Sequence, residues 1–248
     1  MSIYMKKPFI ICNWKMNPAT PREAKKITQE IARITEAKKG TVIIAPPTLF
    51  IERVRALYPW VAGQDISAHA AGAYTGQISA RMLRKENVSY VIVGHSERRK
   101  YQCETDEQIA QKIKQAHGEK ITPIICVGET KKATIPQAWN KIKKQLDILI
   151  PSLVRGGNYI FAYEPVWAIG GNKEVDPKYA TDIIYRIKLY VRTQTQEVSP
   201  VIYGGSVNCE NIDSLLYYKN TIDGFLVGSA SVRPKEIKNI IKKIYGSY

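Results

Sequence analysis

One carboxylate in the sequence stands where it could remove a proton from a bound substrate. Glu164 ends the apolar run Tyr159–Tyr163, and Pro165 follows it directly. A proline restricts the preceding residue to extended backbone, so the Glu164 carboxylate is expected to be fixed at the end of a strand. The next residues, Val166–Ile169, are unusually apolar for a surface loop, which indicates a lid that excludes water. The segment predicts a general base under a lid, and an ordinary strand end beside a core-packed loop fits it equally well.

Further residues that could do chemistry follow other apolar runs. Asn13 and Lys15 come after Phe9–Cys12, and His95 comes after Tyr90–Val93. Taken singly, a lysine of this kind is most often a surface charge, and such a histidine is most often structural. They become informative if the fold brings them to the same place as Glu164, where they would add a cation and an imidazole to the carboxylate.

The elements that would position these residues alternate along the chain. Short apolar runs are separated by amphipathic stretches, of which the last is clearest, with Ile237, Ile240, Ile241 and Ile244 on one helix face. The apolar runs are mostly continuous, as is typical of strands buried on both faces. The predicted strands are Phe9–Cys12, Thr41–Ala45, Trp60–Ala62, Tyr90–Val93, Ile121–Val127, Tyr159–Glu164, Val201–Tyr203 and Gly224–Val227.

Eight strands, each followed by a helix, in 248 residues predict an α/β protein. The expected fold is a (β/α)8 TIM barrel, with eight parallel strands, an outer ring of helices and a single domain over residues 1–248. An open, doubly wound sheet is the alternative, and it would normally carry a glycine-rich phosphate loop after the first strand. The residues there, Asn13–Asn17, include no glycine, which disfavours a dinucleotide site.

In such a barrel, the residues that follow every strand meet at one face. The last two predicted strands lead there into glycine and serine: Gly204, Gly205, Ser206, Gly228 and Ser229. Each of these two short segments alone fits an ordinary turn. In a barrel, however, exposed backbone N–H groups at the ends of the last two strands commonly hold a phosphate. Together with the carboxylate, imidazole and cation, they predict proton abstraction next to the carbonyl of a small phosphorylated sugar.

Composition limits the remaining classes of function. The net charge is +15, but the lysines recur on the polar faces of helical stretches, without a basic tail or a nucleic-acid-binding motif, so no nucleic-acid partner is expected. Neither is a membrane span or a signal peptide. The cysteines Cys12, Cys103, Cys126 and Cys209 lack metal-ligand spacing. We expect no metal, no cofactor and no disulfide, and a location in the cytoplasm.

Four segments resemble the triosephosphate isomerase family. They are Asn13–Asn17, Val93–Arg99, Ala162–Gly170 and Tyr203–Ser206, and the resemblance runs in order from Phe9 to the last helix. It implies an intramolecular aldose-ketose isomerase of glycolysis and gluconeogenesis. The reaction would interconvert dihydroxyacetone phosphate and D-glyceraldehyde 3-phosphate through an enediol(ate).

The resemblance also implies a role for each site residue. Glu164 would be the base and His95 the neutral electrophile, as known for this family, while Lys15, with Asn13 beside it, would stabilise negative charge. Glu97 would orient Lys15, and Ser96 would cap the helix after the fourth strand. Gly171, Ser206, Gly228 and Ser229 would bind the phosphate. The lid would consist of Pro165, Val166, Trp167, Ala168, Ile169, Gly170 and Gly171.

A family loop matching Ala71–Gln77 implies a homodimer with Thr75 at the contact between subunits. Two alternatives remain at this point. Another barrel phosphosugar isomerase would need a different base at the end of the sixth strand. A non-catalytic basic binding protein should have lost Lys15, His95 or Glu164, and all three are present.

Overall fold

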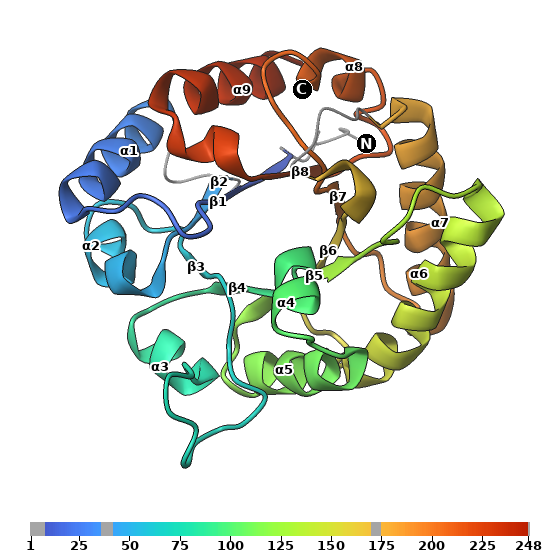
Figure 1. The fold of residues 1–248 in the computed structure, drawn as a ribbon, viewed down its shortest axis with the longest axis horizontal. Coiled ribbons are helices and arrows are strands. Elements are labelled where there is room, and N and C mark those ends of the chain that lie inside the picture. The colour runs from blue at the N-terminus through green and yellow to red at the C-terminus, as the bar shows by residue number, and fades with distance from the viewer. Residues whose placement is uncertain (1–7, 36–41, 170–174, 248) are drawn as a thin grey trace.

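A computed structural model describes residues 8–35, 42–169 and 175–247 of the chain. Eight strands form a ring at its centre, with the helices around them (Figure 1). The strands are β1 (Phe9–Asn13), β2 (Val42–Ala45), β3 (Ala62–Gly63), β4 (Tyr90–Val93), β5 (Thr122–Val127), β6 (Ile160–Tyr163), β7 (Val201–Tyr203) and β8 (Gly224–Val227). The eight predicted strands are confirmed, with ends that differ by at most two residues.

All neighbouring strands are parallel, in the order β2-β1-β8-β7-β6-β5-β4-β3. The two edges of this sheet meet through a parallel bridge between Ile44 and Val61, where the Ile44 N–H donates to the Trp60 carbonyl at 3.0 Å. The sheet is therefore a nearly closed barrel, and the predicted (β/α)8 architecture is confirmed. An open, doubly wound sheet is excluded.

The continuous apolar pattern of the strands reflects burial on both faces. Alternate residues of β1 belong to different hydrophobic clusters: Ile11 packs with residues of the barrel interior, while Ile10 and Cys12 pack with residues of the helices. All three are 0 % exposed. A strand covered on both sides has no solvent face, so it shows no polar alternation.

The helices are α1 (Pro21–Ile34), α2 (Ile51–Arg55), α3 (Ala80–Lys85), α4 (Ser96–Tyr101), α5 (Asp106–Gly118), α6 (Ile135–Leu149), α7 (Pro177–Thr195), α8 (Ile212–Leu216) and α9 (Pro234–Ser247). Short 3₁₀ turns add η2 (Thr48–Phe50), η3 (Ile150–Ser152), η4 (Val166–Ala168) and η5 (Ser229–Val232). In α9, the predicted isoleucine face is fully buried. None of the helices in the described ranges has the length and hydropathy needed to cross a membrane.

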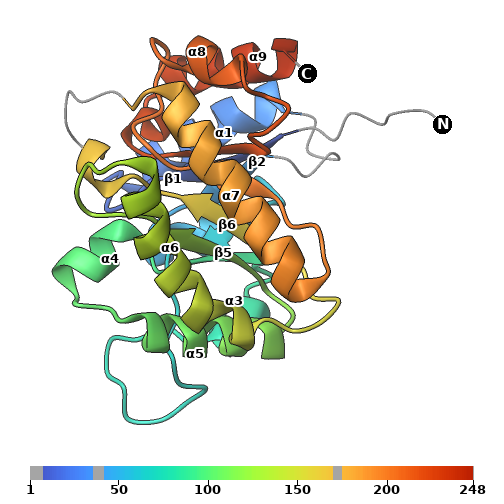
Figure 2. The ribbon, with the colours of Figure 1, turned by 90° about the vertical axis from the view of Figure 1, so that its right-hand side faces the viewer.

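Seen from the side, α4 projects at one end of the barrel (Figure 2). The residues that follow β1, β4 and β6 reach this end, because the strands are parallel and their carboxyl ends point the same way. The loop between β3 and α3, residues 64–79, extends away from the barrel in both views (Figures 1 and 2).

Candidate active site

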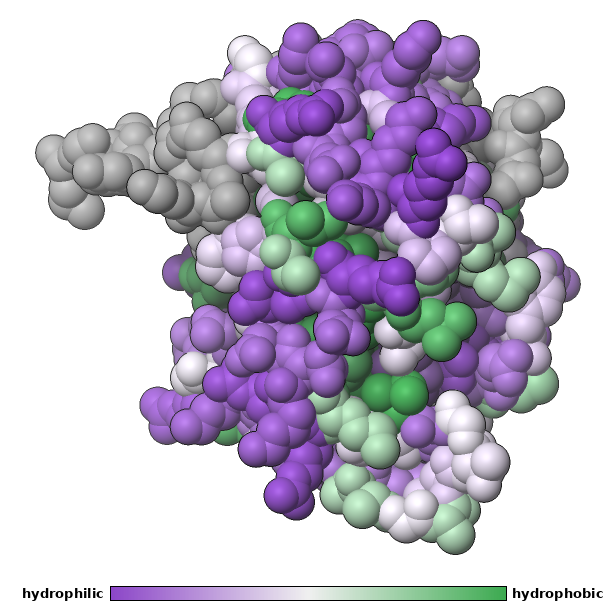
Figure 3. Space-filling view, turned by 90° about the vertical axis from the view of Figure 1, so that its left-hand side faces the viewer, coloured by the Kyte–Doolittle hydropathy of each residue, from purple (hydrophilic) through white to green (hydrophobic). Residues whose placement is uncertain are grey.

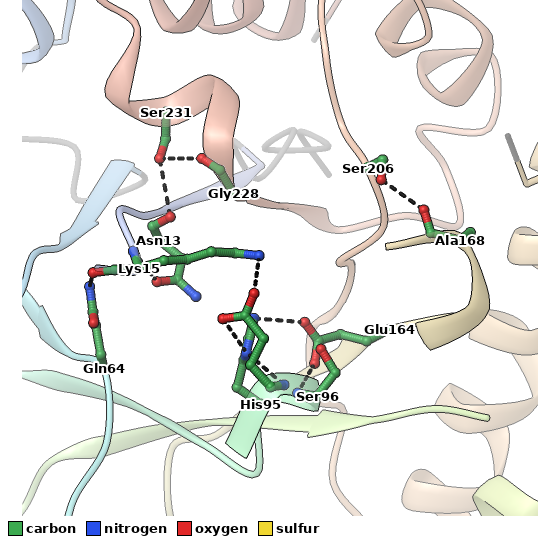
Figure 4. Close-up of polar contacts among 11 residues, drawn as sticks. Asn13, Lys15, Gln64, His95, Ser96, Glu164, Ala168, Ser206, Gly228 and Ser231 are labelled. Carbon is green, nitrogen blue, oxygen red and sulfur yellow. Dashed lines mark hydrogen bonds and ion pairs between the residues drawn. The ribbon is translucent and has the colours of Figure 1, made fainter. Parts of the chain in front are cut away.

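Side chains from the ends of β1, β4 and β6 point toward one another (Figure 4). Lys15 Nζ lies 2.6 Å from Glu97 Oε1, and His95 Nε2 lies 3.2 Å from Glu164 Oε1. The barrel thus brings together a cation, an imidazole and a carboxylate from three distant parts of the sequence. Their meeting at one face is the arrangement that the sequence predicted.

Lys15 is held from both sides of its backbone. Its N–H donates to Asn13 Oδ1 at 3.0 Å, and its carbonyl accepts from Gln64 Nε2 at 2.8 Å. Its φ of 55° lies in the left-handed region, which is unfavourable for a lysine. The surrounding hydrogen bonds hold this conformation, and the side chain then reaches Glu97, whose predicted pairing with Lys15 is present.

His95 occupies the position before the first residue of α4. Its Nδ1 accepts a hydrogen bond from the Glu97 N–H at 3.3 Å, while the Glu97 carboxylate is 3.7 Å from Nδ1 and beyond hydrogen-bond distance. An imidazole that accepts at Nδ1 and carries its proton on Nε2 is the neutral tautomer. In this form Nε2–H is a donor directed into the site, where it meets Glu164.

Glu164 is 2 % exposed, so bulk water is largely kept from its carboxylate. Its own N–H donates to the Val127 carbonyl at 2.8 Å, and its Oε2 accepts from the Ser96 N–H at 2.9 Å. Gly128 makes room for this strand end, because a Cβ at that position would lie 1.8 Å from the Glu164 carbonyl oxygen. The Glu164 carboxylate is therefore fixed at the end of the strand, as we expected from the proline that follows it.

The expected capping role of Ser96 is wrong. His95 is the capping residue of α4, and Ser96 is the first residue inside the helix, with a buried Oγ that has no hydrogen-bond partner among the residues that the structure describes. Its contribution is the backbone N–H that binds Glu164. The first N–H groups of a helix lack partners within the helix, so they are free to bind a carboxylate.

Three residues that make contacts in the site were missed from the sequence. Gln64 binds the Lys15 carbonyl, and Ser231 Oγ donates to the Asn13 and Gly228 carbonyls at 3.3 and 2.7 Å. Glu129, which is 0 % exposed, accepts a hydrogen bond from Trp167 Nε1 at 2.7 Å. A signal for Glu129 existed, since it follows β5 as Glu164 follows β6, but polar partners of backbone groups leave no pattern in a sequence.

One of the predicted phosphate-binding residues, Gly228, lies beside Lys15. Gly228 precedes η5 and Ser229 begins it, and a Cβ on Gly228 would lie only 3.2 Å from Lys15 Cε. Glycine therefore lets the lysine side chain pass close to the end of β8. Ser206 lies at the end of β7, where its Oγ donates to the Ala168 carbonyl of the lid at 2.8 Å.

The first half of the predicted lid forms the turn η4, preceded by Pro165 and followed by Ile169. Ala168 is buried, and Val166, Trp167 and Ile169 are half-buried. Gly170 and Gly171, which include one predicted phosphate ligand, lie outside the described residues.

Two buried thiols, those of Cys12 and Cys126, lie near the site. Burial, together with the neighbouring Glu164 carboxylate, raises the pKa of the Cys126 thiol well above its ordinary value. Burial raises the pKa of Cys12 to about 12. Both side chains therefore stay protonated. Within the ranges that the structure describes, His, Cys, Asp and Glu side chains form no group of three that could hold a metal ion.

A groove of about 680 Å³ leads from Lys15 and His95 toward the projecting loop. Its lining includes a cluster of opposite charges, in which Lys112 pairs with Asp65 (Nζ to Oδ1, 2.6 Å) and with Glu104. Burial raises the pKa of Asp65, and the nearby Lys112 ammonium opposes that rise. The opposite charges largely compensate one another, and the ion pairs hold these side chains in place along the groove.

The sequence matches the family profile described as triosephosphate isomerase over residues 8–244. Relatives of that name include proteins from Buchnera aphidicola subsp. Cinara cedri (38 % identical, covering 96 % of this chain and 98 % of the relative) and Delftia acidovorans (38 %, covering 96 % and 98 %). A third, from Paracidovorax citrulli, is 39 % identical, covering 95 % and 98 %.

Proposed function

The chain belongs to the triosephosphate isomerase family, and from this premise we propose how its residues divide the reaction. The activity is the interconversion of dihydroxyacetone phosphate and D-glyceraldehyde 3-phosphate. The observation that carries the assignment is the contact of 3.2 Å between His95 Nε2 and Glu164 Oε1 in a site that also holds the Lys15 ammonium. A base and a donor this close can act on adjacent atoms of one three-carbon substrate.

Glu164 removes a proton from the carbon next to the carbonyl and returns it to the neighbouring carbon. His95 Nε2–H donates to the substrate oxygen on which negative charge develops. Lys15 adds a fixed positive charge beside that oxygen, and Glu97 and Asn13 hold the lysine in place. Ser96 contributes through its N–H, which positions the Glu164 carboxylate.

The phosphate is assigned to the ends of β7 and β8. Ser206, Gly228 and Ser229 stand there, and Gly171 completes the set in the sequence. Backbone N–H groups at these two strand ends suit an anion. The lid, Pro165–Gly171, would cover the substrate and keep water from the enediolate.

Proton transfer through Glu164 predicts exchange with solvent. In D₂O, we expect the protein to place deuterium on carbon in both triose phosphates, because a carboxylate that has taken the proton can exchange it before returning it. Proton NMR of the recovered substrate and product measures the label. Full isomerisation without carbon-bound deuterium would contradict proton transfer by a base and favour a direct hydride shift.

We also propose that the protein is a homodimer in the cytoplasm. Exposed apolar side chains lie around the groove and the projecting loop: Met16 (93 % exposed), Tyr74 (41 %), Met82 (57 %) and Tyr101 (65 %). Figure 3, from the side of α1 and α2, shows hydrophobic surface interspersed among hydrophilic side chains. The loop of one subunit would fill the groove of the other. All four cysteines are free, which supports the proposed compartment.

Thr75 tests the dimer. Thr75→Arg places a charge at the exposed tip of the loop, so we expect sedimentation velocity to shift from twice the chain mass of 28.0 kDa to a single chain. Thr193→Arg, on the exposed side of α7, is the control and should leave the dimer unchanged. A wild-type protein that sediments as a fully active monomer at micromolar concentration would contradict the proposal.

A further inference from the structure

A buried carboxylate contacts both the lid and the strand that leads to the base. Glu129 is 0 % exposed and accepts hydrogen bonds from Trp167 Nε1 (2.7 Å), Tyr163 OH (3.1 and 3.2 Å) and Tyr179 OH (3.2 Å). Within the described ranges, no lysine or arginine nitrogen lies within 4.0 Å of the Glu129 carboxylate oxygens. Burying a carboxylate is unfavourable unless donors replace water, so these neutral donors hold Glu129 in place.

Tyr179 contributes to this cluster in two ways. Besides its hydrogen bond to Glu129, its ring packs edge to face against Trp167, with centroids 6.3 Å apart and an interplanar angle of 75°. Lys132 Nζ lies 5.5 Å from the centre of the same indole. Trp167 is therefore fixed by a hydrogen bond, an aromatic contact and a cation.

The cluster joins the two segments that flank the lid. Trp167 lies in η4, directly after the base, and Tyr179 lies in the first turn of α7, after the lid. The backbone of Glu129 also contributes, since its carbonyl accepts from the Val166 N–H at 3.0 Å. Tyr163, a further donor, immediately precedes Glu164. A shift of Glu129 would therefore reach both the lid and the strand end that carries the base.

We propose that Tyr179 is a positioning residue for the isomerase reaction, which holds Glu129 and Trp167 so that the first half of the lid is aimed at the enediolate. This inference rests on the lid role proposed above. Burial and the Glu129 carboxylate raise the pKa of Tyr179 to about 12, so its hydroxyl remains a donor at physiological pH.

A misplaced lid has a measurable chemical consequence. In the enediolate, the C1 oxygen can re-form a carbonyl while the electron pair of the C1–C2 double bond moves to form a double bond between C2 and C3. The C3–O bond breaks in the same step, and its electron pair leaves with inorganic phosphate. A lid that holds the phosphate and excludes water suppresses this elimination. The ratio of phosphate released to product formed therefore reports lid position, whereas a general loss of stability lowers both rates together.

Tyr179→Phe is the test, because it removes the hydroxyl and keeps the ring against Trp167. We expect kcat to fall and phosphate release per isomerisation to rise, each by about three- to tenfold, the range expected for one hydrogen bond. In protein labelled with 5-fluorotryptophan, the fluorine resonance of Trp167 should move while those of the other tryptophans stay. Tyr185→Phe, exposed on the same helix, is the matched control and should match the wild type.

The experiment distinguishes a failure of the role assigned to Tyr179 from a failure of the proposed isomerase function. An active wild type and a Tyr179→Phe variant with unchanged partitioning and an unmoved Trp167 resonance would overturn the role of Tyr179. A folded wild type without isomerase activity would overturn the proposed function instead. If Tyr179→Phe does not fold, Trp167→Phe carries the test, since it removes another donor to Glu129 and should raise phosphate release in the same way.

Discussion

Glu164→Asp is expected to lower kcat about 100-fold, because the shorter side chain withdraws the carboxylate by about 1 Å from the substrate carbon. This corresponds to about 2.7 kcal/mol of transition-state stabilisation. The charge and the chemical class of the base are kept, so the loss measures position alone. The shorter side chain also moves the carboxylate away from the Ser96 N–H and His95 Nε2. A coupled assay with glyceraldehyde 3-phosphate as substrate gives kcat and KM.

The matched control is Glu210→Asp, the same change at an exposed position near the end of β7. It should leave kcat within about twofold of the wild type, as expected for a surface substitution. Comparable activity of Glu164→Asp and the wild type would remove Glu164 as the base. That result would also favour the alternative interpretation of the neighbouring segment, a loop that packs on the core.

Lys15→Met is expected to reduce kcat about 100- to 1,000-fold, the usual cost of losing one group that stabilises developing negative charge. Methionine has a similar length and no charge, so the packing beside Gly228 is largely kept. The partner of Lys15, Glu97, has a side chain that is 41 % exposed, so its carboxylate remains solvated and folding should change little. Thermal unfolding followed by circular dichroism checks this point beside the kinetics.

Lys25→Met, on the exposed face of α1, is the control for loss of one positive charge and should retain wild-type kcat and KM. Lys15→Arg adds a sharper comparison. A guanidinium is larger and planar, and the side chain runs past Gly228 in a narrow space, so arginine should restore little of kcat. A Lys15→Met variant with more than about half of the wild-type kcat/KM would contradict the role of the ammonium in catalysis.

Much of the barrel was predictable because burial leaves a clear record in the sequence. Continuous apolar runs such as Tyr90–Val93 identify strands covered on both sides, and the isoleucine spacing in Pro234–Ser247 identifies a helix face. Several predicted strand ends differ from the observed ones by one or two residues, because hydrogen bonds to neighbouring strands decide where a strand stops. Trp60–Ala62 illustrates this, because the pairing with β4 begins only at Ala62.

The residues proposed to carry the chemistry could be selected from the sequence as candidates, because each stands near the end of a predicted strand and the strand ends of a barrel meet at one face. Pro165 constrains Glu164, glycines follow β7 and β8, and Lys15 and His95 each come two residues after the end of a strand. The incorrect expectation concerned Ser96. A serine before a charged helical stretch has the chemistry of a cap, but β4 ends so that His95 takes that position and the Ser96 N–H turns to Glu164.

By itself, then, the sequence determined which side chains stand at the strand ends and that eight strands would carry them. The tertiary structure alone decided which of them touch. Lys15 meets Glu97 across 82 positions and Ser96 meets Glu164 across 68, and Glu129 gathers donors from three segments. The physical reason is that barrel closure sets these distances through strand register and side-chain packing, and neither leaves a local signal in the chain.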